Sequence, residues 1–255
     1  CCQEIDDAAE VCMEHSMTGY TQDQFVKLQE IYEHSKRRVK SSIPFIEETY
    51  DDFTYEILRL DDPLGLAIGT LTDCCQEIDD AAEVCMEHSM TSPDGRVFVI
   101  KDKENNIVAQ SWVWRNKNVL CFDNIEIPHK AFERAAQKKI NLTEIVYDMY
   151  KQAANILLKK DQEMYKSLLE KGEITQPEYD ALCLSKVTIG LGYNDIAEEL
   201  KKQATLDTSI LAHPLPYDAP VKLNRSLYTN DSTTQYIIAG QQDNLNRSPM
   251  ENKAI

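Results

Sequence analysis

Three apolar segments separated by short polar turns constrain the fold of this chain more than any other part of its sequence. The segments are Val97–Ile100, Ile107–Arg115 and Val119–Ile127, joined by Lys-Glu-Asn-Asn and Asn-Lys-Asn. Such spacing is typical of antiparallel strands that follow one another in a meander. Apolar residues fall on both faces in SWVW and VLCF, so we expect the middle of the sheet to be covered on both sides, with Trp112 and Trp114 in the core.

A long amphipathic stretch follows the three strands. Residues Asn141–Lys171 repeat apolar side chains at helical spacing, and Gly172 is placed to end the helix. Thr175 is then placed to cap a short second helix. We therefore expect a helical hairpin between the meander and the last strands.

Capping and spacing signals predict the remaining elements. They are a helix from the capping box Thr21–Gln24 to about Lys40, extended segments at Tyr55–Leu60 and Leu66–Ile68, a helix over Cys74–Met90 capped by Thr72 or Asp73, a strand at Val187–Ile189, a helix from the 190–195 turn to about Lys202, and strands at Leu227–Tyr228 and Gln235–Ala239. The set predicts an α+β fold: a central, mainly antiparallel sheet flanked by helices, with an added N-terminal helical section and the inserted hairpin.

Residues 1–18 are identical, letter for letter, to residues 74–91. Structural repeats normally diverge and tile the chain, whereas nothing around these two copies repeats. We interpret residues 1–18 as an artefact or engineered copy and residues 74–91, which sit in continuous context, as the native one. The expected organisation is then a helical section over 19–91, an α+β core over 92–240 and a polar tail over 241–255.

Composition excludes some classes of function. The net charge is −16, so a polyanion such as DNA would be repelled and a nucleic-acid partner is not expected. Three of the eight cysteines belong to the duplicate, and the other five are too few and irregular for a disulfide framework, which indicates a cytoplasmic compartment. No apolar run is long enough to span a bilayer, and we expect no membrane association.

The order of helix, three-strand meander, long helix, strand, helix and terminal strands resembles the GNAT-type N-acyltransferase fold, over about residues 92–240. It is carried by RVFVIKDKENNIVAQSWVWRNKNVLCFDNIEIP, the Asn141 helix and VTIGLGYNDIAEEL. In that family a loop of the form Arg/Gln-x-x-Gly-x-Gly/Ala holds the pyrophosphate of coenzyme A. Here the loop is replaced by PHKAFERAAQKKIN, which has no glycine. The resemblance then implies phosphate contacts from the side chains of Lys130, Arg134, Lys138 and Lys139, with Asn194 as a further cofactor contact.

The resemblance also implies the chemistry of acyl transfer, or an inactive descendant that only binds. A carboxylate must accept the proton of the amine, and Glu126 and Asp123 interrupt an otherwise apolar strand. A tyrosine or thiol would protonate the leaving thiolate, and Tyr193 or Tyr228 is the candidate. The substrate would be a small molecule or a protein.

Two other classes of function stay open. Cys74 or Cys75, in the first turn of a helix that precedes an antiparallel sheet, would fit a cysteine-dependent hydrolase of the papain-like kind, although no strand of the meander carries a histidine. A zinc site is not expected, because Cys75 and Cys85 would lie about 15 Å apart on one straight helix. The third class is a non-catalytic protein whose acidic surface and helical hairpin contact a protein partner or a second copy.

Overall fold

The structure, a computed structural model, describes residues 21–36, 40–72, 82–190, 198, 201–206 and 235–240. Its strands form one eight-stranded sheet in the order β1-β2-β3-β4-β5-β6-β8-β7. The strands are β1 Glu47–Tyr50, β2 Phe53–Ile57, β3 Gly95–Asp102, β4 Ile107–Asn116, β5 Val119–Phe122, β6 Lys186–Gly190, β7 Thr205–Leu206 and β8 Gln235–Gly240. All neighbours pair antiparallel except β5 and β6, which are parallel.

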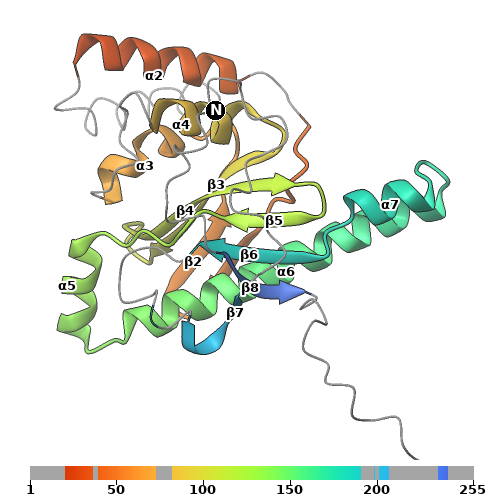
Figure 1. Cartoon of the computed structure of the whole chain (residues 1–255). Coiled ribbons are helices and arrows are strands. Elements are labelled where there is room, and N and C mark those ends of the chain that lie inside the picture. The colour runs from red at the N-terminus through yellow and green to blue at the C-terminus, as the bar shows by residue number, and fades with distance from the viewer. Residues whose placement is uncertain are drawn as a thin grey trace, which may run out of the picture.

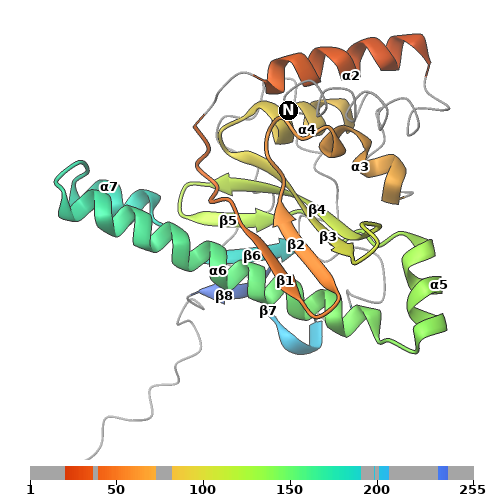
Figure 2. The same cartoon turned by 180° about the vertical axis from the view of Figure 1, so that it is seen from behind.

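Helices cover both faces of this sheet (Figures 1 and 2). The helices are α2 Gln22–Ser35, α3 Leu64–Thr72, α4 Ala82–Thr91, α5 His129–Lys138, α6 Leu142–Glu170 and α7 Gln176–Leu182. Helix α6 crosses one face, and α2, α3 and α4 lie on the other, while α7 and the end of α6 project from the body. The α+β architecture with a mainly antiparallel sheet is the one predicted, and the elements follow one another in the order that the resemblance implies.

The core is divided by the sheet into two layers. Phe98 and Phe122 pack with Tyr150 of α6 as edge-on aromatic pairs, 4.8 to 5.2 Å between ring centroids. On the opposite face, Trp112 and Trp114 are buried in a second apolar cluster with residues of α3 and α4. Covering on both faces therefore agrees with the apolar residues of SWVW and VLCF.

The helical hairpin is confirmed in detail. Helix α6 begins after the N-cap Asn141 and ends before Gly172, whose φ of +70° is the left-handed conformation that glycine adopts easily. Thr175 caps α7 through a capping box with Glu178. The capping box at Thr21 also begins α2 as predicted, but that helix ends at Ser35 rather than near Lys40.

One prediction in the N-terminal section is wrong. Leu66–Ile68 is not extended but lies in α3, because Asp62 Oδ1 accepts a hydrogen bond from Leu64 N and Pro63 suits a helix start. Of the two predicted caps of the next helix, Thr72 instead ends α3, its hydroxyl donating to Ile68 O, and Asp73 lies outside the described residues. The segment 19–91 also contributes β1 and β2, which extend the sheet from β3.

The last strand of the meander is shorter than expected. Regular pairing in β5 ends at Phe122, whereas the apolar pattern predicted a strand to Ile127. The interruption falls on the acidic residues singled out from the sequence. Among the described helices none is both long and apolar enough to cross a membrane.

Candidate functional site

The chain bulges immediately after β5. Val113 pairs with Phe122 and Gln110 with Glu126, so three steps along β4 correspond to four steps along the other strand. One extra residue is therefore inserted, which defines a β-bulge. Backbone hydrogen bonds resume beyond it, with Gln110 N donating to Glu126 O at 2.9 Å and Glu126 N to Gln110 O at 3.0 Å.

The bulged segment, residues 123–126, also marks where β5 and β6 part. Their last parallel pair is Phe122 with Ile189, while Gly190 continues to pair with Gln235 of β8. Within the described residues, the bulged segment thus keeps β4 as its neighbour on one side and has no strand on the other. A bulge of this kind re-aims side chains, so the regular alternation of faces along β5 does not continue through residues 123–126.

A polar cluster lies at the bulge, inside the sheet. Asp123 and Asn124 are each 3% exposed, and Asn124 Nδ2 donates to Glu126 Oε1 at 2.7 Å. Ser111 Oγ donates to the Asn124 carbonyl and shares a 2.7 Å hydrogen bond with the Tyr150 hydroxyl. Asn124 Oδ1 is buried and has no hydrogen-bond partner in the described part of the chain. Polar groups are seldom left this way unless a ligand or water completes them.

Tyr150 is held in its protonated form by these surroundings. Burial raises its pKa far above the usual value of a phenol, the hydrogen bond with Ser111 opposes that rise, and the charges of Glu126 and Asp123 add to it. The hydroxyl therefore remains a hydrogen-bond donor at neutral pH. Sequence reasoning missed Tyr150 and Ser111, because a tyrosine in an apolar helical stripe and a serine next to Trp112 were interpreted as core residues.

Helix α5 follows the bulged segment directly and carries the predicted cofactor residues. Lys130 and Arg134 are four residues apart, hence on one face, and both line a cavity of about 590 Å³. Lys101 and Asp62 line the same cavity, together with Pro128 at the N-cap of α5. We call it the basic cavity, since three cations and one carboxylate face it.

The three cations of the basic cavity differ in how they are engaged. Arg134 lies 3.5 Å (Nε to Oδ2) from the buried Asp102 and donates to Ile107 O at 3.3 Å. Lys101 Nζ is 2.5 Å from Glu56 Oε1. Lys130 makes no ion pair in the described part of the chain. Lys130 is thus the cation most available to a ligand.

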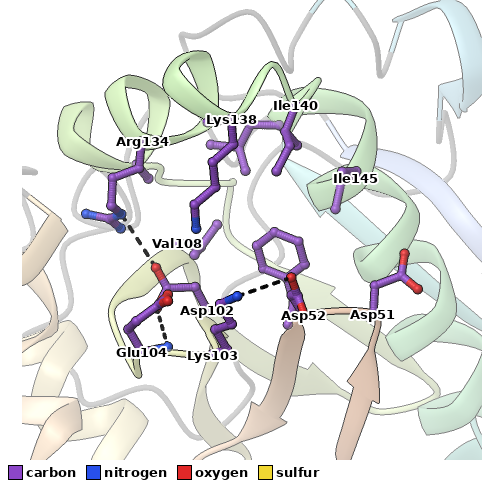
Figure 3. A pocket seen from close by; sticks show the side chains of 14 residues that line it. Asp51, Asp52, Asp102, Lys103, Glu104, Val108, Arg134, Lys138, Ile140 and Ile145 are labelled. Atoms are coloured by element: carbon purple, nitrogen blue, oxygen red, sulfur yellow. Dashed lines mark hydrogen bonds and ion pairs between the residues drawn. The ribbon is translucent and has the colours of Figure 1, made fainter.

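A second, smaller cavity of about 280 Å³ also lies against α5 (Figure 3). Its lining includes the apolar Val108 and Ile145, and Lys138 reaches down into it from α5. Arg134 lines both cavities and contacts Asp102 in this one. Lys130 thus lines only the basic cavity and Lys138 only the smaller one.

The structure brings together only some of the predicted site residues. Asp123 and Glu126 share the bulged segment, and Glu126 accepts a hydrogen bond from Asn124 within it. Five predicted residues lie outside the described residues, so their roles stay predictions. They are Cys74, Cys75, Tyr193, Asn194 and Tyr228.

Comparison with known proteins adds little. No family model matches the chain, and no curated protein matches it. A solved structure of a mutant of SpeG, a spermidine N-acetyltransferase from Vibrio cholerae, is similar at 11% sequence identity, covering 74% of this chain and 92% of that chain, with a TM-score of 0.37. A structural similarity as weak as this does not indicate the function of this chain.

Proposed function

We propose that this chain is an N-acyltransferase that takes its acyl group from an acyl-coenzyme A thioester. One observation carries the proposal: the basic cavity opens at the end of the bulged strand that holds Asp123 and Glu126. Pro128 lines the cavity and follows Glu126 by two residues, a span of about 7 Å at most. Phosphate-binding cations and a candidate base therefore lie within the length of one extended ligand.

In the basic cavity, phosphate groups would be bound by charged side chains rather than by backbone N–H groups. The segment after β5 has no glycine, so a cradle of closely approaching backbone N–H groups is not expected. Lys130, which forms no ion pair in the described part of the chain, supplies positive charge instead, while Lys101 and Arg134 add cations already engaged with Glu56 and Asp102. In a chain of net charge −16, a polyanionic substrate is favoured where cations gather in this way.

We assign Glu126 as the general base that accepts the proton of the amine. In the transfer the amine nitrogen attacks the thioester carbonyl, its proton passes to the Glu126 carboxylate, the C–N bond forms and the C–S bond breaks. The products are an amide and the free thiol, once the thiolate takes up a proton. The acidic surface would attract a cationic amine toward this base.

Binding is tested first, with coenzyme A and the full chain in calorimetry. We expect Lys130→Glu to weaken binding at least tenfold, since a cation facing the phosphates becomes an anion. Lys138→Glu is the matched control, because it makes the same charge change on the same helix but faces the other cavity. Equal effects of the two changes, or no binding by the parent chain, would overturn the placement of coenzyme A.

Chemistry is tested separately, by thiol release from acetyl-coenzyme A with a panel of primary amines. Glu126→Gln keeps an acceptor for Asn124 Nδ2 but cannot take up a proton, so we expect a loss of about 10²–10⁴ in rate with coenzyme A binding retained. Glu133→Gln, on the exposed side of α5, is the control. Unchanged transfer in Glu126→Gln would remove Glu126 from the mechanism.

A further inference from the structure

Arg96 of β3 carries a buried positive charge that forms no ion pair within the described residues. The residue is 5% exposed, and Nη1 donates to the carbonyl oxygens of Ser92, at 2.9 Å, and Gly95. No ion pair with Arg96 exists in the described part of the chain. Burial lowers its pKa to about 10, while the charge of Asp94 acts in the opposite direction. Buried charges are normally paired or bound to a ligand, so this arrangement calls for an explanation.

The end of helix α4 compensates only part of the charge. Ser92 follows the last residue of α4, and the C-terminal end of a helix is equivalent to about half a negative elementary charge. The charge of Asp94 also acts on Arg96, but the two side chains form no ion pair in the part of the chain that the structure describes. Among the described residues Arg96 Nε and Nη2 also have no hydrogen-bond partner, so part of the guanidinium fork is unused.

Arg96 lines an open cavity of about 690 Å³, which we call the Arg96 cavity. It lies between the end of α2, residues 41–47 and the end of β2, and its wall is apolar at Ile43, Ile57 and Leu58. Most other charged side chains there are already paired. Lys36 pairs with Glu33, Arg59 with Asp61 and Glu56 with Lys101. Glu47 and Asp62 are the carboxylates in the wall that form no ion pair with any described residue.

We propose that the Arg96 cavity binds a small organic monocarboxylate with an apolar body. The carboxylate would pair with the unused side of the Arg96 guanidinium, since the planar fork matches two carboxylate oxygens. The apolar body would cover Phe45, which lines the cavity and is 50% exposed. A singly charged ligand is favoured over a phosphate because Glu47 and Asp62 repel a second negative charge. This site is distinct from the basic cavity, and it does not depend on acyl transfer.

The test compares two probes of nearly equal shape, isovalerate and the neutral isovaleramide, titrated into the full chain. We expect isovalerate to bind in the millimolar range, as suits so few atoms, and the amide to bind at least tenfold more weakly. Arg96→Gln should abolish the preference for the acid. Arg59→Gln is the control, since it removes an exposed cation from the rim of the same cavity.

Several results would overturn the proposal. Equal binding of acid and amide, no binding of isovalerate at tens of millimolar, or unchanged binding in Arg96→Gln would leave Arg96 as a cap of α4 only. Tighter binding of inorganic phosphate than of isovalerate at equal ionic strength would contradict the monocarboxylate. If Arg96→Gln does not fold, the test is made by NMR on the parent chain. The chemical shift of Arg96 Nε must then change on addition of isovalerate and stay unchanged on addition of isovaleramide.

Discussion

Arg115 and Asp161 form the most deeply buried ion pair described in the chain. Arg115 Nη1 lies 2.5 Å from Asp161 Oδ1, and the two side chains are 3% and 0% exposed. Asp161 also accepts from Leu184 N at 2.7 Å, and Arg115 donates to the carbonyl oxygens of Ser42 and Leu182. The pair thus ties the end of β4 to α6 and to the segment that leads into β6.

We expect Asp161→Asn to lower the free energy of unfolding by about 3 kcal/mol, because it leaves the Arg115 charge buried without its partner. Urea denaturation measures the change. Glu163→Gln removes an exposed partner of Lys159 on the same helix and should alter stability by less than about 0.5 kcal/mol. A loss below about 1 kcal/mol in Asp161→Asn would contradict the assigned role.

Asp62 predicts a pH-dependent effect at the residue scale. Burial raises its pKa in the folded chain, although the hydrogen bond from Leu64 N opposes the rise. A carboxyl with a raised folded pKa binds its proton more tightly when folded, so its ionisation costs stability as pH increases through the unfolded value, about 3.8, and beyond. Asp62→Asn, which can still cap α3, should therefore raise the melting temperature at pH 7 and not below pH 3.8.

Two substitutions separate that effect from capping. Asp62→Ala also loses the acceptor for Leu64 N, and the loss of this helix cap should lower the free energy of unfolding by about 1 kcal/mol. The rise in melting temperature at neutral pH should therefore be smaller for Asp62→Ala than for Asp62→Asn. Melting curves of both variants across pH 3 to 8 provide the measurement. A gain in Asp62→Asn that is the same at all pH values would contradict the role of ionisation.

At the scale of the element, α5 ends in a conformation that its sequence does not favour. The residue after the helix, Lys139, has φ +57° and ψ +39°, the left-handed region that suits glycine. We expect Lys139→Gly to stabilise the chain by about 0.5–1 kcal/mol. Lys138→Gly, one residue earlier and inside the helix, should instead destabilise it by about 1 kcal/mol. Thermal unfolding of the two variants measures both changes in stability. Changes of the same sign in the two variants would contradict the assigned helix end.

At the scale of the whole molecule, the two identical segments are not equivalent. Within the second copy, α4 spans Ala82–Thr91 and buries Cys85, Met86 and Met90 against its neighbours, whereas residues 1–18 lie outside the described residues. Since the second copy is continuous with β3, we expect it to keep this packing site. Removal of residues 1–18 should then leave the oligomeric state in light scattering unchanged. A shift from oligomer to monomer would show that the first copy exchanges between chains.

Local signals in the sequence were enough for elements whose ends depend on a few neighbouring residues. The meander, the helix beginning at Asn141, the hairpin at Gly172 and the capping box at Thr175 were all predicted, because alternation, caps and a positive φ act within about one turn of chain. The burial of Trp112 and Trp114 followed from the same reasoning.

Tertiary structure decided what depends on residues far apart in sequence. The bulge at residues 123–126 arises from the register between β4 and β5. The separation of β5 from β6 involves strands more than sixty residues apart in the sequence. The Arg115–Asp161 pair joins residues on different elements. Pairing register and burial of charge are long-range properties, since they depend on which surfaces the folded chain brings together. Sequence alone could therefore nominate Asp123, Glu126, Lys130 and Arg134. Only the folded chain places Lys130 and Arg134 in the wall of a cavity, and Asp123 and Glu126 in the bulged segment that precedes it.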